Sequence, residues 1–216
     1  MENKSKKVVG KVILIVAVII LIATATYYVM LKQEQAKVEQ NIETIFNALK
    51  AGDTDTQNKY LAYDKMFENT EDTEESTEET ILEEDNTQFN ELFRKLDYKI
   101  ISTSANFKKA TVVVEITNKD CGTIFKNYFT KALQLAFVSA FSDEYSEEEL
   151  DSQLQQYLIE QVESEDIQTI TNTISLDMEK ENGEWKITTD TNVLVNAVLP
   201  GFIDKINETQ SALSEE

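Results

Sequence analysis

The hydrophobic pattern opens with an unbroken apolar run at residues 12–31, which contains no charged side chain. A helix rises about 1.5 Å per residue, so this run spans about 30 Å, the thickness of a bilayer's hydrocarbon core. Four lysines precede it: Lys4, Lys6, Lys7 and Lys11. Tyr27 and Tyr28 lie near its far end, where tyrosine rings favour the headgroup boundary. Because clustered lysines stay in the cytoplasm, we predict a cytoplasmic tail at 1–11, a transmembrane helix at 12–31 and an extracytoplasmic domain beyond it.

The same run also fits a cleaved signal peptide. Residues 12–22 have the length of a signal-peptide core, and Ala23-Thr24-Ala25 matches the small-residue cleavage pattern. Cleavage near Ala25 would give a secreted protein. Against cleavage, the apolar character continues to Leu31. A buried core helix is a third interpretation, disfavoured because a soluble helix normally has a polar face. No cysteine lies near the run, which excludes a lipid-anchored lipoprotein.

Helical periodicity continues directly after the apolar run. Five apolar residues recur at helical spacing: Val38, Ile42, Ile45, Phe46 and Leu49. This helix and the transmembrane segment can form one continuous rod. Gly52 is placed to end the helix, and Asp53 or Thr54 can begin a second one. We therefore expect residues 32–67 to be the helical start of the extracytoplasmic domain.

Residues 68–86 change character, because they contain ten acidic residues and no basic one. Such a Thr/Glu-rich segment has too little apolar surface to order itself, which predicts a disordered loop. A calcium site is the functional alternative. The EF-hand pattern, however, is absent, and the tract has no glycine to form the turn.

The rest of the chain, residues 87–206, alternates between helical and strand patterns. Short helices are predicted at 89–96 and after Asp190, and longer ones at 122–141 and after the capping box Ser146–Glu149. The apolar stripe of the 122–141 helix predicts that it packs on a sheet or inside the fold. Two hairpins are predicted: one from strands at 98–103 and 110–117, and one from a strand at 169–178 that turns at Asn182-Gly183. A flexible tail is expected at 207–216. Together these elements predict an α+β domain with an antiparallel sheet curled around helices.

The amino-acid composition excludes several kinds of catalytic and binding site. The chain has 216 residues, 20 Lys+Arg against 40 Asp+Glu, a net charge of -20, no histidine, one cysteine and five scattered glycines. These counts exclude a Ser-His-Asp triad, an HExxH zinc site, an internal disulfide and a glycine-rich phosphate loop. The acidity argues against nucleic-acid binding, because phosphates would be repelled. We expect no catalytic, cofactor-binding or metal-binding residues and no cofactor.

Four residues are weighed as exceptions. Glu115 and Asp177 lie on predicted strands and would suit proton abstraction if buried, although both fall on the Ser/Thr-rich or mixed face of their strands. Cys121 precedes a helix, where its thiol would be either activated or simply packed. Trp185 follows the Asn-Gly turn and would either stack on a ligand or fill the core. In addition, the stretch 94–131 has eight bases against three acids, which fits either internal charge balance or a docking patch for an anionic partner.

Three segments resemble a protein family, and a fourth, LKAGD at 49–53, looks like the end of the first helix in the nuclear-transport-factor-2-like superfamily. The three are ITNKDCGTIFKNYFTKALQLAF at 116–137, NGEWKI at 182–187 and VNAVLPGF at 195–202. These segments are similar to membrane- or lipid-anchored proteins of low-GC Gram-positive bacteria that are catalogued as domains of unknown function. The resemblance covers about residues 32–202 and implies a nuclear-transport-factor-2-like cone, a curved sheet around helices with a pocket. It implies nothing specific about activity, and the missing lipoprotein cysteine sets this chain apart from the lipid-anchored members.

The expected function is that of a single-pass membrane protein whose outer domain binds a ligand or partner without catalysis. Its partners would be the lipid bilayer, and an envelope protein or a small apolar ligand, but no nucleic acid. One alternative is a scaffold subunit of a cell-envelope or secretion assembly, by analogy at the level of fold. A second is a small-molecule isomerase or cyclase that uses a pocket carboxylate.

Overall fold

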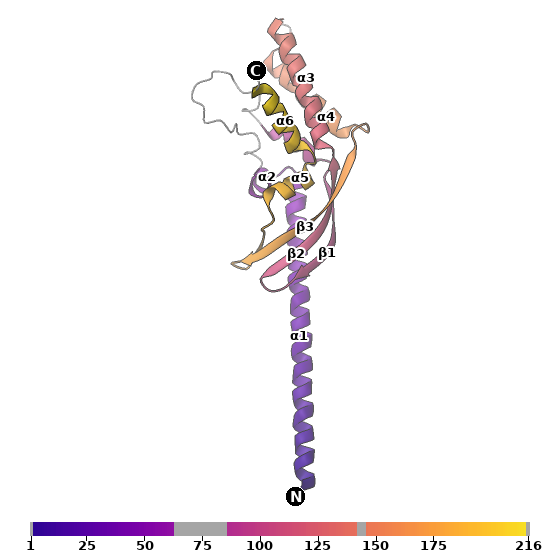
Figure 1. Cartoon of the computed structure of the whole chain (residues 1–216), viewed down its shortest axis with the longest axis vertical. Helices are drawn as coiled ribbons and strands as arrows, with labels where there is room; N and C mark the ends of the chain where they lie inside the picture. The colour runs from indigo at the N-terminus through magenta and orange to yellow at the C-terminus, as the bar shows by residue number, and fades with distance from the viewer. Residues whose placement is uncertain (1, 63–85, 142–145, 215–216) are drawn as a thin grey trace.

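The computed structural model describes residues 2–62, 86–141 and 146–214. Helix α1, Glu2–Lys50, is one unbroken rod that passes from the apolar run into the folded domain (Figure 1). The remaining helices are α2 (Thr54–Leu61), the 3-10 helix η2 (Asn86–Phe93), α3 (Cys121–Phe141), α4 (Glu147–Glu163), α5 (Thr191–Val198) and α6 (Phe202–Ser214). The strands are β1 (Asp97–Ala105), β2 (Lys109–Lys119), β3 (Thr169–Glu181) and β4 (Glu184–Ile187).

The strands form one antiparallel sheet in the order β1-β2-β3-β4, which curves around the upper part of α1 (Figure 1). Alternation along β2 puts Val112, Val114 and Ile116 on the core face, where all three are fully buried. On the opposite face, the side chains of β2 are mostly half-buried, whereas those of β3 form an exposed row of threonine and serine residues, Thr169, Thr171, Thr173 and Ser175. The predicted α+β class, with an antiparallel sheet and a long apolar N-terminal helix, is confirmed.

The core lies between the curved sheet and the second half of α1. All five residues of the predicted α1 stripe, Val38 to Leu49, are buried. The Phe46 ring stacks on Tyr98 of β1 with 4.9 Å between centroids. Helix α5 packs against β2 and β3, and α6 packs against α3. Most helical stability comes from burying such a stripe, so the domain fixes the second half of α1 in place.

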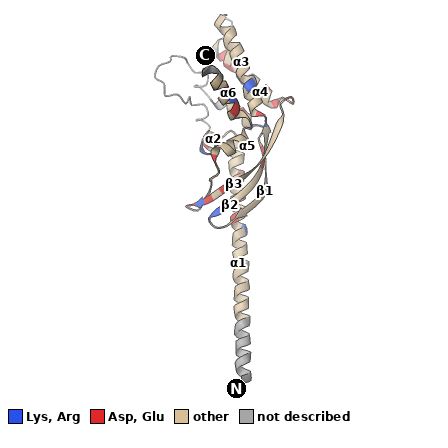
Figure 2. Cartoon of the chain, viewed as in Figure 1, with Lys and Arg blue, Asp and Glu red and all other residues tan. Residues whose placement is uncertain are grey.

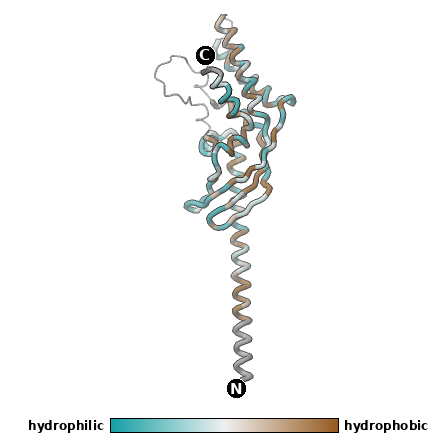
Figure 3. Tube along the Cα trace, in the orientation of Figure 1, coloured by the Kyte–Doolittle hydropathy of each residue, from teal (hydrophilic) through white to brown (hydrophobic). Residues whose placement is uncertain are grey.

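The first half of α1 has no such partner. The described side chains between Leu14 and Met30 are exposed along the whole helix, including Ile19, Leu21 and Tyr28. Figure 3 shows most of this apolar rod standing clear of the domain, and only its far end reaches the β1–β2 turn, where Tyr27 contacts Phe107. It is the only helix among the described residues long and apolar enough to cross a membrane. A segment of this kind near the N-terminus is expected of a membrane anchor or of a signal sequence.

Three predictions of local structure need correction. Helix α2 ends at Leu61 because the next residue, Ala62, adopts a left-handed conformation with φ of 50°. The Ala62 N–H donates to the carbonyl oxygen of Asn58 and so caps the end of the helix. The predicted 89–96 helix is the 3-10 helix η2. Helix α6 continues to Ser214, whereas the sequence predicts a flexible tail from 207. The acidic tract at 68–86, apart from Asn86, lies outside the described residues, and so does its possible calcium site.

Candidate partner-binding surface

Helix α3 has most of its buried residues in its first half and projects beyond the sheet over its second half (Figure 1). Its base is fixed by Ile124, Phe125 and Tyr128, which are buried with η2 and α6. The Phe125 ring lies 5.2 Å from that of Phe202 on α6. This packing holds the projecting half of α3 in a defined direction.

Three large apolar side chains at four-residue spacing, Leu133, Phe137 and Phe141, face solvent on the projecting half. Their exposed fractions are 45%, 68% and 77%. The rings of Phe137 and Phe141 contact each other at 4.9 Å between centroids. We call these three residues the α3 ridge. The expectation that the whole α3 stripe is packed inside the fold is therefore wrong for this half, because Ala132 and Leu135 are buried there while the three ridge residues are exposed.

An acidic helix start lies next to this half of α3. Helix α4 follows α3 after a short connection and runs back along it. The predicted capping box is present: Glu149 N–H donates to Ser146 Oγ, and Ser146 N–H donates to Glu149 Oε2 at 2.9 Å. These hydrogen bonds from Ser146 lower the pKa of Glu149. Glu148, Glu149 and Asp151 are exposed, so the start of α4, which follows the projecting half of α3 in the chain, carries negative charge (Figure 2).

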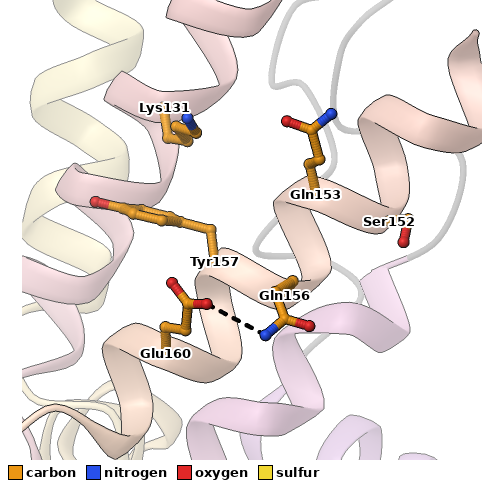
Figure 4. A pocket seen from close by; sticks show the side chains of 6 residues that line it. All are labelled: Lys131, Ser152, Gln153, Gln156, Tyr157 and Glu160. Atoms are coloured by element: carbon orange, nitrogen blue, oxygen red, sulfur yellow. Dashed lines mark hydrogen bonds between the residues drawn. The ribbon is translucent and has the colours of Figure 1, made fainter. Parts of the chain in front are cut away.

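Two open hollows lie along α4. One, of about 350 Å³, is lined by Lys131 from α3 and by five α4 residues: Ser152, Gln153, Gln156, Tyr157 and Glu160 (Figure 4). Lys131 lies over the Tyr157 ring, 6.0 Å from its centroid. The second, of about 410 Å³, is lined by Glu148, Glu149, Ser152 and Gln153. Both hollows are open to solvent, whereas a pocket for a small ligand normally encloses most of the ligand's surface.

The two candidate carboxylates lie on the outer face of the sheet, away from the core. Glu115 is half-buried between Val114 and Ile116, which both point to the opposite face. Asp177 is exposed and accepts a hydrogen bond from the Thr111 hydroxyl at 3.0 Å. Neither lines the two hollows on α4. Within the described residues, no three acidic or cysteine side chains gather in a way that could hold a metal ion.

Cys121 and Trp185 are core residues. Burial, and then the neighbouring Asp120 carboxylate, raise the pKa of the Cys121 thiol far above its ordinary value, so the buried thiol is not activated by its helix. Trp185 is 5% exposed and packs in the core cluster, with the Lys180 ammonium 5.5 Å from its ring. Its position beneath the β3–β4 hairpin agrees with the packing interpretation.

The basic stretch at 94–131 is divided among several elements. Lys95 pairs with Glu163 at 2.5 Å, and Lys109 pairs with Glu179 at 2.7 Å. Lys119 donates to the carbonyl oxygens of Ser164 and Ile167. Part of the stretch is therefore balanced within the domain, by carboxylates of α4 and β3.

A buried ion-pair cluster joins α1 to the sheet. Glu34 lies one helical turn before Val38 on the buried stripe and accepts hydrogen bonds from Lys180 of β3 and from Lys37, the latter at 2.8 Å. Its side chain is only 9% exposed. Glu34 was not predicted as a functional or structural site, although its sequence position, in register with the apolar stripe of α1, was a usable signal. The cluster fixes the sheet to α1 just beyond the apolar run.

We expect Glu34→Gln to lower the free energy of unfolding by about 1 kcal/mol near neutral pH. The hydrogen bonds from Lys180 and then Lys37 lower the pKa of Glu34 below its ordinary value. A carboxyl group whose pKa is lowered by folding stabilises the folded state at pH values above its ordinary pKa. This stability is lost as the pH falls through the pKa of the folded state. The difference in melting temperature between wild type and Glu34→Gln should therefore shrink as the pH falls below 4.5, the ordinary pKa of a glutamate. Glu43→Gln, an exposed change on the same helix, is the control; an equal pH response in both variants would contradict the role of Glu34.

No protein-family model matches the sequence, and neither the curated proteins nor the solved structures include a match.

Proposed function

We propose that the chain is a single-pass membrane protein whose α+β domain lies outside the cytoplasm and binds a protein partner through the α3 ridge, without catalysis. The lysine-rich start and the exposed apolar half of α1 support the membrane anchor. The position of the ridge, at the end of the molecule opposite the apolar rod, supports a role in reaching a partner away from the bilayer (Figure 1).

The observation that carries the proposal is the exposure of Leu133, Phe137 and Phe141 on a firmly based helix. Leaving such side chains in water forgoes roughly 1.5–3 kcal/mol each relative to full burial. Contiguous exposed apolar patches typically mark interaction sites. A row of side chains four residues apart is also the ridge that packs into the groove of a second helix.

Charge indicates the chemistry of the partner. Glu148, Glu149 and Asp151 lie in the first turns of α4, which follows the projecting half of α3, and the whole chain carries a net charge of -20. Two copies of the chain would bring these acidic groups together, which disfavours self-association through the ridge. An amphipathic helix with an apolar face and basic flanks fits both the ridge and its rim.

The two alternatives differ in their support. A scaffold subunit of an envelope assembly would use the same ridge, so it is a narrower form of the proposal. An isomerase or cyclase would need a carboxylate in a closed apolar site, but Glu115 and Asp177 lie on the outer face of the sheet. The geometry therefore favours binding over catalysis.

Photocrosslinking from the ridge tests the proposal. With p-benzoylphenylalanine in place of Phe137 in the full chain, in cells, we expect a discrete adduct of higher mass. The same probe in place of Thr130, which is exposed on the same helix, is the control and should give little adduct. Phe141→Ser in the probe-bearing chain should weaken the adduct, because it removes the neighbouring ring.

Equal adducts from both positions would contradict the ridge as the binding surface. An adduct of twice the chain's mass would show a second copy on the ridge and overturn the charge argument. The Phe137→Ser/Phe141→Ser variant should keep the melting temperature of wild type, since both rings are exposed, so loss of its complex would not arise from unfolding.

A further inference from the structure

The tip of the β1–β2 hairpin carries an exposed aromatic ring on a tightly held turn. Asn106 N–H donates to the Lys109 carbonyl at 2.9 Å, and Asn106 Oδ1 accepts the N–H groups of Lys108 and Lys109, each at 2.8 Å. Phe107, at the tip, is 38% exposed. Turn tips usually carry glycine, proline or small polar residues, so a phenylalanine there needs an explanation.

The tip touches the apolar run of α1. The Phe107 ring packs edge-on against Tyr27, with 5.7 Å between centroids. Tyr27 lies four residues before Leu31, the end of the run, which places this contact about 6 Å inside the apolar segment along the helix axis. The hairpin tip and the last turn of the membrane segment therefore lie at the same level.

The length of the run fixes where the bilayer must end. Lys11 limits the run on one side. If the bilayer ended before Tyr27, only residues 12–26, about 15 residues, would be available to span it. A spanning helix needs roughly 17 residues or more. The run can cross the membrane only if Tyr27 lies in the bilayer's outer boundary, and Phe107 then lies there with it.

The surrounding charges suit a headgroup layer. Lys32 lies over the Tyr28 ring, 5.9 Å from its centroid, and Lys108 is exposed beside Phe107. Long lysine side chains extend to phosphates while aromatic rings occupy the interface below them. The acids Glu179, Glu34 and Glu181 near this end of the domain are paired with Lys109, Lys180 and Lys186, so their charges are balanced there despite the charge of the whole chain.

We infer that the β1–β2 hairpin is a second membrane contact, in which Phe107 inserts into the headgroup region of the outer leaflet beside Tyr27 and sets the orientation of the domain against the bilayer. This inference rests on the proposed membrane anchoring. With the Glu34–Lys180 cluster holding the sheet to α1, the hairpin and the helix enter the bilayer as one rigid unit.

Depth-dependent fluorescence quenching tests the contact. The full chain, with Lys108→Cys labelled by an NBD fluorophore, is placed in nanodiscs of phosphatidylcholine and phosphatidylglycerol. The native Cys121 is buried and should stay unlabelled, which the unsubstituted chain verifies. We expect 5-doxyl phosphatidylcholine to quench the label at position 108 several-fold more than a label at Gln134→Cys on α3. Adding Phe107→Ser should remove most of this difference.

A label at Tyr27→Cys separates two kinds of failure. Quenching at position 27 together with water-like emission at 108 would overturn the hairpin contact and leave the anchor intact. No quenching at either position would overturn the membrane anchor as well. Quenching at 108 that Phe107→Ser leaves unchanged would show that the ring does not carry the insertion, and would overturn the inference as stated.

Discussion

Replacing Asn118 by leucine is expected to lower the free energy of unfolding by about 3 kcal/mol. Asn118 is fully buried near the end of β2. Its side-chain amide donates to the carbonyl oxygen of Leu92 at 3.0 Å and to that of Val198 at 2.8 Å, so one residue joins η2, β2 and α5. Leucine has a similar volume but would leave both buried carbonyl oxygens without this donor, at roughly 1–3 kcal/mol each.

Chemical denaturation of the full chain in detergent micelles measures this change. Trp185, the single tryptophan, is buried in the core and reports the transition. Asn196→Leu, an exposed change on α5, is the control and should alter stability by less than about 0.5 kcal/mol. Asn118→Asp should be at least as damaging as Asn118→Leu, because a carboxylate would face two carbonyl oxygens. Equal stability of Asn118→Leu and Asn196→Leu would show that this amide does not hold the three elements together.

Local patterns predicted those parts of the fold that depend on neighbouring residues. The alternation along β2 and β3, the Asn182-Gly183 turn and the Ser146–Glu149 capping box all appear where the sequence places them. Each of these signals rests on backbone geometry within a few residues. The apolar run of α1 is equally local, because its length and lack of charge suffice to mark it.

The candidate surface could not be predicted in the same way. The apolar residues of α3 occupy more than one face, and only the reach of η2, α4 and α6 decides which of them are covered. Leu135 is buried while Leu133 and Phe137 are exposed on the same turns of the helix. Likewise, the Glu34–Lys180 pair joins residues 146 positions apart, which no local period indicates. Exposure and long-range pairing are properties of packing, so they needed the structure.

The direction of the α3 ridge also depends on how the base of α3 packs against the turn before α6. We expect Gly122→Ala to lower the free energy of unfolding by about 3 kcal/mol, although alanine is normally the better helix former. A β-carbon at position 122 would lie 2.5 Å from the carbonyl oxygen of Gly201 and 2.8 Å from its carbonyl carbon. These atoms belong to the backbone and cannot rotate away. The Gly122 N–H also donates to Pro200 O at 3.0 Å, a hydrogen bond that the displaced helix would lose.

Gly183→Ala provides the matched control, because it separates close packing from backbone conformation. Gly183 has φ of 91° in the β3–β4 turn, and a β-carbon there would meet nothing within 4 Å. Its substitution should cost only conformational strain, about 1 kcal/mol. The same denaturation measurement should rank Gly122→Ala as clearly the more damaging change. If the two variants were equally stable, α3 would tolerate separation from the turn before α6, and the fixed direction of the α3 ridge would need another support.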